Sequence, residues 1–267
     1  MHKQYVHGYS AREAVRLVDQ ATTLTELLHA DTHYPAGSTV LEAGCGVGAQ
    51  TVTLAKNSPQ ARITSIDISE ASLAEARKRV EAQGHRNVTF QRADLFHLPF
   101  DPASFDHVFV CFVLEHVADP PAALACLRRV LKPGGTITVI EGDHGSAYFH
   151  PRNKATDRAI QCLVELQARA GGDALIGRRL FPLLTGAAFR EVRVSPRMVY
   201  TDASRPALVD GFTRKTFTAM VEGVREPALA AGLIDAATWQ EGIRGLYRTA
   251  EADGTFCYTF FKATAAC

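Results

Sequence analysis

The chain has 267 residues, of which 46% are hydrophobic and 21% charged, a composition typical of a globular protein rather than a disordered or fibrous one. Its 29 Lys and Arg residues against 28 Asp and Glu residues leave a net charge of +1, so it lacks the basic field that captures nucleic acid or an anionic membrane surface. Six scattered cysteines without a C-x-x-C pair, no membrane-spanning run and no apolar stretch after the N-terminus predict a cytoplasmic protein with reduced thiols.

The first half of the chain alternates between two kinds of pattern. Apolar residues at helical spacing from Ser10 to about His29 predict an N-terminal helix with one buried face. The strands expected after it are 39–43, 62–67, 87–92, 106–110 and 136–140. The helices expected between them are 50–56, 70–83 and 121–131. This alternation predicts right-handed βαβ units, and therefore an α/β fold with a doubly wound parallel sheet.

The regular alternation of strand and helix patterns ends after Ile140. A helix is expected over 155–170, and two further strands over 190–199 and 255–262. The interval 201–254 has mostly helical spacing, and a structured connection of this length is more often functional than idle. The expected organisation is therefore an N-terminal lid helix in residues 1–35, a core in 36–200 and 255–267, and a helical cap in 201–254.

A glycine-rich turn follows the first expected strand. Gly44, Gly46 and Gly48 stand between that strand and a helix, where they permit a tight turn and let a ligand lie against bare backbone at a helix N-terminus. Asp67 ends the second strand, where a carboxylate can accept both hydroxyls of a ribose. The turn also satisfies the loose G-x-G-x-x-G/A pattern of dinucleotide-binding proteins, so an NAD-dependent oxidoreductase is the competing interpretation.

Three further features argue against a dinucleotide. Glu42, two residues before the first glycine, would face a pyrophosphate unfavourably but would suit a cation. Asp94 ends the third strand, where it can accept from an adenine amino group. The run from Leu131 to Gly135 leads into the fifth strand. The combination of these features, more than any one of them, decides between the two interpretations.

With these motifs in place, the chain resembles a class I S-adenosylmethionine-dependent methyltransferase. The resemblance covers about residues 38–141 and includes Phe105-Asp106 before the fourth strand and Leu131-Lys132-Pro133-Gly134-Gly135 before the fifth. It implies a Rossmann-like, mostly parallel sheet of seven strands with helices on both faces. The last strand would be antiparallel, and the helical cap would be inserted between strands six and seven.

The resemblance also implies the contacts to S-adenosylmethionine. The glycines would leave room for the methionine portion, and Glu42 would help to hold its amino end. Asp67 would bind the ribose hydroxyls, and Asp94 would accept from the adenine amino group. Residues expected to pack near the cofactor or its methyl group are Ile68, Leu95, Cys111 and Phe112. Tyr9 and Gln20 would close over the cofactor, with a lid helix that serves only in packing as the alternative.

Candidate acceptor-site groups follow strands four and five. Glu115, His144 and Tyr9 are the favoured catalytic residues, each with the alternative that it only orients the substrate. His116 is interpreted as a helix histidine bonded to backbone. Some quinone-pathway O-methyltransferases carry a Glu-x-x-Glu-His metal group, but here Phe112 stands at the first glutamate position, so no metal is expected.

The expected substrate is a small, flat, apolar metabolite such as an indole-like heterocycle of secondary metabolism, methylated at N, C or O. This expectation depends on aromatic and sulfur side chains of the cap, which equally suit the cap's own core: Phe212, Phe217, Met220 and Trp239. A non-catalytic cofactor-binding protein of the same fold is the second competitor. No nucleic-acid or membrane partner is expected, and self-association into a homo-oligomer is left open.

Overall fold

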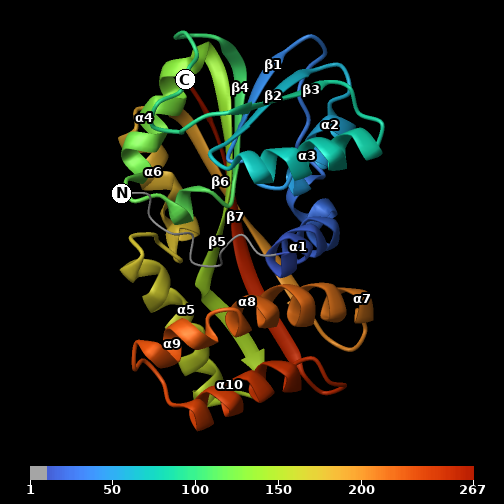
Figure 1. The fold of residues 1–267 in the computed structure, drawn as a ribbon, viewed down its shortest axis with the longest axis vertical. Helices are drawn as coiled ribbons and strands as arrows, with labels where there is room; N and C mark the ends of the chain where they lie inside the picture. Colours follow the sequence, from blue (N-terminus) through green and yellow to red (C-terminus); the bar gives the residue numbers. More distant parts are fainter. Residues whose placement is uncertain (1–10) are drawn as a thin grey trace. The chain divides into compact units, whose positions relative to one another are not determined.

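The computed structural model describes residues 11–267, apart from the side chains of residues 11–14. Figure 1 shows its elements in chain order. The first part contains α1 (Ala11–His29), β1 (Thr39–Ala43), α2 (Ala49–Asn57), β2 (Arg62–Asp67), α3 (Glu70–Ala82), β3 (Val88–Arg92), β4 (Phe105–Cys111), η1 (Leu114–His116) and α4 (Pro120–Val130). The second part contains β5 (Leu131–His150), α5 (Lys154–Arg169), η2 (Ile176–Arg179), α6 (Leu180–Gly186), β6 (Arg190–Thr201), α7 (Pro206–Leu208), the π-helix η3 (Val209–Thr218), α8 (Ala219–Glu222), α9 (Arg225–Ala230), α10 (Ala236–Arg248) and β7 (Thr255–Ala266). No described helix is both long enough and apolar enough to span a membrane.

The strands form one seven-stranded sheet in the order β3-β2-β1-β4-β5-β7-β6. Strand β1 pairs in parallel with β2 and β4, β2 with β3, and β4 with β5. Strand β7 runs against β5, because Cys267 N–H donates to Gly135 O while Thr259 N–H donates to Ser146 Oγ. The expected Rossmann-like sheet of seven mostly parallel strands is confirmed, with a helical interval between β6 and β7.

The expected start of the fifth strand at Thr136 is wrong. Strand β5 begins at Leu131, which pairs with Phe105, while Thr136 pairs with His107. A single β4 residue, Asp106, therefore lies opposite the four β5 residues 132–135, and Gly134 takes a φ of 77° in this bulge. The Lys-Pro-Gly-Gly run, which the sequence placed before the fifth strand, lies inside it, because β5 pairs with β4 on both sides of the run.

The chain divides into two compact units. One, the parallel-sheet unit, comprises residues 28–141, 176–196 and 261–267. The other, the helical unit, comprises residues 1–27, of which 11–27 are described, with 142–175 and 197–260. Strands β5, β6 and β7 each contribute residues to both units. The lid and cap roles expected for residues 1–35 and 201–254 stay predictions.

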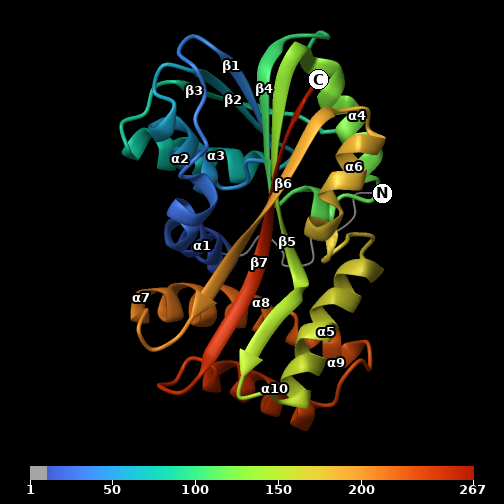
Figure 2. The same ribbon diagram turned by 180° about the vertical axis from the view of Figure 1, so that it is seen from behind.

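Within the parallel-sheet unit, apolar strands are covered on both faces. The middle of β4 is fully buried, and α2 with α3 lies on one side of the strands while α4 with α6 lies on the other (Figures 1 and 2). Helix α3 begins where the sequence predicts, because Ser69 Oγ accepts the N–H of Ser72 at 3.2 Å. It ends before Gly84, whose φ is 76°. These helices fix the loops at the carboxyl ends of the parallel strands.

The helical unit has an aromatic core of its own. Phe212 and Phe217 of the π-helix pack against Phe256, Tyr258 and Phe260 of β7, with ring centroids 4.7 to 6.4 Å apart. The four cap side chains that suggested a flat acceptor are all buried: Phe212, Phe217, Met220 and Trp239. Their burial is the outcome expected of side chains that form the core of their own unit.

A polar network joins the amino ends of three strands. Asp106 Oδ2 accepts from both the N–H and the hydroxyl of Thr39 at 2.8 and 2.7 Å, and Asp106 Oδ1 accepts from Lys132 Nζ at 2.7 Å. The Lys132 ammonium and the bonds from Thr39 hold the pKa of the Asp106 carboxyl below its ordinary range. Two residues of the family-like motifs thus serve the fold at the end of the sheet opposite the glycine turn.

We expect Asp106→Asn to lower the free energy of unfolding by about 1 kcal/mol at pH 7, because a third of the side chain is exposed and solvent screens the ion pair. The folded pKa of Asp106 lies below its unfolded value, so its contribution is complete above about pH 4 and disappears as the pH falls further. Urea unfolding of both proteins from pH 7 down to pH 3 checks this. A difference that stays constant down to pH 3 would contradict the ion-pair assignment.

Candidate functional site

The candidate site lies at the carboxyl ends of β1, β2, β3 and β4. The sheet order reverses direction between β1 and β4, and such a switch point is where doubly wound sheets bind ligands. The residues expected there all belong to the parallel-sheet unit: Glu42, Gly44, Gly46, Gly48, Asp67, Ile68, Asp94, Leu95, Cys111 and Phe112.

Each glycine of the turn has a left-handed backbone, with φ values of 74° at Gly44, 52° at Gly46 and 77° at Gly48. At Gly48 a Cβ would lie 2.8 Å from the backbone of Ala76, so the glycine permits the close approach of α3. At Gly46 a Cβ would meet nothing within 4 Å. Gly48 therefore serves packing, whereas Gly46 presents bare backbone to open space.

Asp67 ties this turn to the next helix. Its Oδ2 accepts the N–H of Gly46 at 2.9 Å, and its Oδ1 accepts the N–H of Ser69 at 2.9 Å. Each carboxylate oxygen has a second lone pair, and the side chain is only partly buried. Asp67 can therefore hold the turn and still accept hydrogen bonds from a ligand hydroxyl.

Glu42 is a buried acid directly before the turn. It is 2% exposed, and its Oε2 accepts from the hydroxyls of Thr51 at 2.7 Å and Ser65 at 2.6 Å. Burial raises the pKa of Glu42 to about 7, although the two hydroxyls oppose this effect. At neutral pH this group is divided between its acid and its carboxylate, so a nearby cation would draw it to the charged form.

The turn after β4 packs directly on the glycine turn. A Cβ at Gly44 would lie 2.5 Å from Val113 Cγ2, so only glycine permits this contact. Phe112 has a φ of 58°, a left-handed value that is unfavourable for an aromatic residue. Its N–H donates to Ile140 O at 2.9 Å. Strain of this kind persists where the surrounding structure holds it, commonly at functional sites.

Glu141, on β5, holds that turn in place. It is fully buried, and its Oε1 accepts the N–H groups of Val113 at 3.0 Å and Leu114 at 2.7 Å. Burial, followed by the charge of Glu115, raises the pKa of Glu141 well above its usual range. Cys111 lies beside the same acids, and burial with the charges of Glu141, Glu42 and Glu115 raises the pKa of its thiol as well. Cys111 is therefore a neutral thiol rather than a nucleophile.

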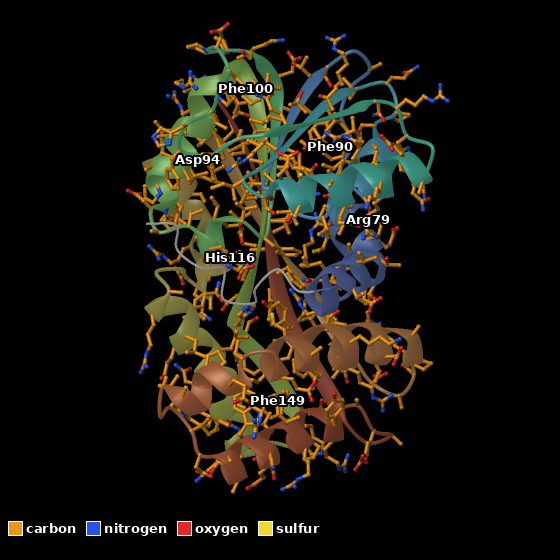
Figure 3. The ribbon with its side chains drawn as sticks, viewed as in Figure 1. Arg79, Phe90, Asp94, Phe100, His116 and Phe149 are labelled. Carbon is orange, nitrogen blue, oxygen red and sulfur yellow. The ribbon has the colours of Figure 1, made fainter. Side chains whose placement is uncertain are left out.

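The short helix η1 carries the two polar residues predicted after β4. Glu115 is buried, with its Oε1 3.5 Å from Nε2 of His116. His116 is partly exposed, and Figure 3 shows it on the segment that follows β4. Glu115 thus lies close to the imidazole of His116.

The third strand ends in a second polar turn. Asp94 Oδ1 accepts the N–H of Phe96 at 2.9 Å, and Oδ2 lies 3.0 Å from Nδ1 of His97. Figure 3 shows Asp94 on the segment that follows β3. Leu95 packs against the core, whereas Ile68 after β2 is 40% exposed. An exposed isoleucine directly after Asp67 offers an apolar surface to a flat ring.

The remaining predicted residues lie elsewhere. His144 belongs to the helical unit, where its Nδ1 shares a 2.7 Å hydrogen bond with the hydroxyl of Tyr258. Gln20, also in that unit, is buried and accepts from Nη1 of Arg16 at 3.0 Å. Tyr9 lies outside the described residues. The structure therefore brings Glu115 together with the predicted cofactor residues, while His144 and Gln20 belong to a different compact unit.

The sequence analysis missed Glu141 and the hydroxyls that bind Glu42. One signal was present for Glu141, because a carboxylate directly after an apolar strand marks the same sheet edge as Asp67 and Asp94. The Ser65 contact follows from register, since Ser65 pairs with Glu42 across the parallel β1–β2 ladder. No local pattern pointed to Thr51, which reaches Glu42 from α2.

Comparison with known proteins shows which domain the residues around this site are similar to. Residues 41–139 match the methyltransferase domain, a range that lies within the parallel-sheet unit. An uncharacterized 37.1 kDa protein in transposon TN4556 of Streptomyces fradiae is 36% identical over 197 residues, 73% of this chain and 56% of that protein. The 27-O-demethylrifamycin SV methyltransferase of Amycolatopsis mediterranei is 34% identical over 134 residues, 50% of this chain and 49% of that protein. The chain thus spans about half the length of these relatives.

Solved structures show the same fold over most of the chain. Phosphoethanolamine N-methyltransferase 2 of Haemonchus contortus, in complex with phosphomonomethylethanolamine and S-adenosylhomocysteine, matches with a TM-score of 0.59. That match has 16% identity and covers 96% of this chain and 58% of the other. The [4+2]-cyclase SpnF matches with a TM-score of 0.57 and 21% identity over 93% of this chain and 80% of the other. At this identity the likeness shows the fold alone.

We expect Gly48→Ala to lower the free energy of unfolding by about 2–4 kcal/mol. The new Cβ adds a left-handed backbone penalty of about 1 kcal/mol to an overpacking cost of about 1–3 kcal/mol against Ala76. The matched control is Gly84→Ala, which has the same φ but nothing within 4 Å and should lose only about 1 kcal/mol. Denaturant unfolding of both variants measures the difference, and equal losses would contradict the close approach at Gly48.

Proposed function

We propose that this protein binds S-adenosylmethionine and transfers its methyl group to a small organic molecule, because residues 41–139 match a methyltransferase domain. The observation that carries the proposal is the arrangement of the glycine turn among four acidic positions. Gly46 presents open backbone, and Glu42, Asp67, Asp94 and Glu115 follow or end the neighbouring strands.

The described residues fit each part of this cofactor. Carboxylates at Asp67 and Asp94 suit the ribose hydroxyls and the adenine amino group, and the exposed Ile68 suits the adenine ring. Glu42 and the bare backbone at Gly46 suit the positively charged methionine portion. When bound, S-adenosylmethionine supplies a methyl group that its positive sulfur already activates. The chain then has to position the acceptor in line and exclude water, which can account for most of the rate enhancement.

The same charges disfavour the nicotinamide alternative. A dinucleotide would place its pyrophosphate at the glycine turn, next to the buried Glu42. A carboxylate and a pyrophosphate next to each other in a low-dielectric site repel. A cationic cofactor reverses the sign of that interaction. Glu42 therefore supports a sulfonium cofactor over a dinucleotide.

The proposal also covers the chemical class of the methyl acceptor. We infer a small aromatic or heterocyclic metabolite, methylated at N, C or O, with Glu115 as the group that orients it or accepts its proton. The names of two relatives give demethylmenaquinone and 27-O-demethylrifamycin SV as their substrates, and neither is a nucleic acid or a protein. We also propose a role in secondary metabolism, which identification of the acceptor would test. Self-association is a further proposal, which a measurement of the oligomeric state would test.

Binding and turnover test the proposal separately. Calorimetric titration of the folded protein with S-adenosylmethionine and with S-adenosylhomocysteine should give micromolar affinity for both. A panel of aromatic nitrogen, oxygen and carbon acceptors should then yield a methylated product by mass spectrometry. Tight binding of reduced nicotinamide with no binding of either sulfur ligand would overturn the cofactor. Binding without turnover of any acceptor would favour a cofactor-binding protein or another chemistry, since the SpnF cyclase shares this fold.

We expect Asp67→Ala to weaken cofactor binding by about 1–3 kcal/mol, because buried ribose hydroxyls would lose a charged acceptor. Calorimetry on a variant shown by circular dichroism to be folded measures the change. Asp101→Ala is a matched control, since Asp101 is an exposed acid in the same unit and should bind as the wild type does. An unchanged affinity in the folded Asp67→Ala protein would remove the ribose assignment.

A further inference from the structure

Helix α3 meets the glycine turn at two points on one face of the helix. A Cβ at Gly48 would lie 2.8 Å from Ala76, so the helix approaches the turn as closely as a glycine permits. Three residues further along α3, Arg79 Nε donates to the backbone oxygen of Val47 at 3.0 Å. Figure 3 shows Arg79 on this helix. Because residues three apart are neighbours on a helix surface, one face of α3 is directed at the turn.

The Arg79 bond holds a peptide group that lies between two glycines. Val47 stands between Gly46 and Gly48, whose φ values are 52° and 77°. The peptide that joins Val47 to Gly48 is held at both ends, since its N–H donates to Cys45 O at 2.9 Å and its oxygen accepts from Arg79. Without the bond from Arg79, rotation of this peptide would meet little resistance at Gly48, which has no Cβ.

The adjacent peptide is tied to the other end of α3. Asp67 Oδ2 accepts the N–H of Gly46, and Asp67 Oδ1 accepts the N–H of Ser69, the residue that caps α3. Asp67 thus connects the turn to the start of the helix, and Arg79 connects it to the last turn. Gly46, which presents bare backbone to open space, lies between these two attachments.

The bond to Val47 needs an N–H group at one position of the side chain, and it needs no charge. The acceptor is an uncharged carbonyl oxygen, and the donor is the nitrogen attached to Cδ of Arg79. Glutamine also carries an N–H donor on its Cδ. Lysine has a methylene group at that place and methionine has a methyl group. Because all four residues have similar helix propensities, exchanging them should leave α3 intact.

We propose that Arg79 is a positioning residue that holds the glycine turn in the conformation that receives the methionine portion of S-adenosylmethionine. The inference rests on the proposed function, which assigns this portion to the turn and the ribose to Asp67. A turn that is already ordered loses less conformational entropy when a ligand binds. Arg79 therefore raises the affinity without touching the ligand, and it does so for ligands that carry the methionine portion.

Calorimetry with two ligands tests this role. S-adenosylhomocysteine carries the amino acid portion, whereas methylthioadenosine has the adenosine without it. We expect Arg79→Met and Arg79→Lys to weaken binding of S-adenosylhomocysteine by about three- to tenfold, the effect of one net hydrogen bond. Binding of methylthioadenosine should stay within about twofold of the wild type. Arg79→Gln, which keeps the donor, should recover most of the affinity for S-adenosylhomocysteine.

Arg77→Met is the matched control. Arg77 is an exposed arginine on the same helix, and its guanidinium lies 5.8 Å from the ring centroid of Phe90. This variant should bind both ligands as the wild type does. Circular dichroism establishes that each variant is folded, and Arg79→Lys keeps the charge, so it serves as the test if Arg79→Met does not fold.

Three results would overturn the role of Arg79. They are wild-type affinity of folded Arg79→Lys for S-adenosylhomocysteine, equal losses for the two ligands, and an Arg79→Gln protein that binds no better than Arg79→Lys. A role of Arg79 in stability alone would give one of these results, because it would not discriminate between the ligands or between the two donors. Failure of the wild-type protein to bind S-adenosylhomocysteine would instead remove the proposed function on which the inference rests.

Discussion

The parallel pairing of β1 with β2 on one side and β4 on the other is the constraint on which the candidate site depends. It buries β1 from Val40 to Ala43 and brings Glu42 beside Ser65 and Phe109. An acid at that position has no access to bulk water, so it needs hydroxyl donors from neighbouring elements. The pairing also places the glycine turn and the turn after β4 in contact, because Gly44 and Val113 follow adjacent strands.

The buried acids Glu42 and Glu141 lower the stability of the fold, because burial disfavours their charged forms. Burial holds the pKa of Glu42 at about 7 and that of Glu141 well above its usual range. Groups with raised folded pKa values stabilise the fold most when they are protonated. Their contribution therefore decreases as the pH rises above the ordinary Glu range. A core built for stability alone would place apolar residues here, and perturbed acids of this kind cluster at functional sites.

The two ends of the parallel strands carry different kinds of polar residues. At the amino ends, Asp106 and Lys132 join β1, β4 and β5 through a hydrogen-bonded network. Toward the carboxyl ends, Glu42 lies in β1 directly before the glycine turn, and Asp67 at the end of β2 accepts the N–H of Gly46 in that turn. Residues from one set of family-like motifs thus separate into a network at the amino ends and a candidate site at the carboxyl ends of the strands. Sequence spacing alone does not separate the two groups. Both ends of a short strand lie within a few residues of the same motif.

The sequence by itself determined the order of strands and helices, the glycine turn, and the carboxylates that end β1, β2 and β3. These features follow from local periodicity, from capping residues such as Ser69, and from the rule that parallel strands end at one edge. Only the tertiary structure decided which side chains meet there. Glu141 reaches the turn after β4 across 27 residues of chain, and the cap aromatics became the core of their own unit. Such contacts depend on strand register and side-chain packing, which no local window of sequence contains.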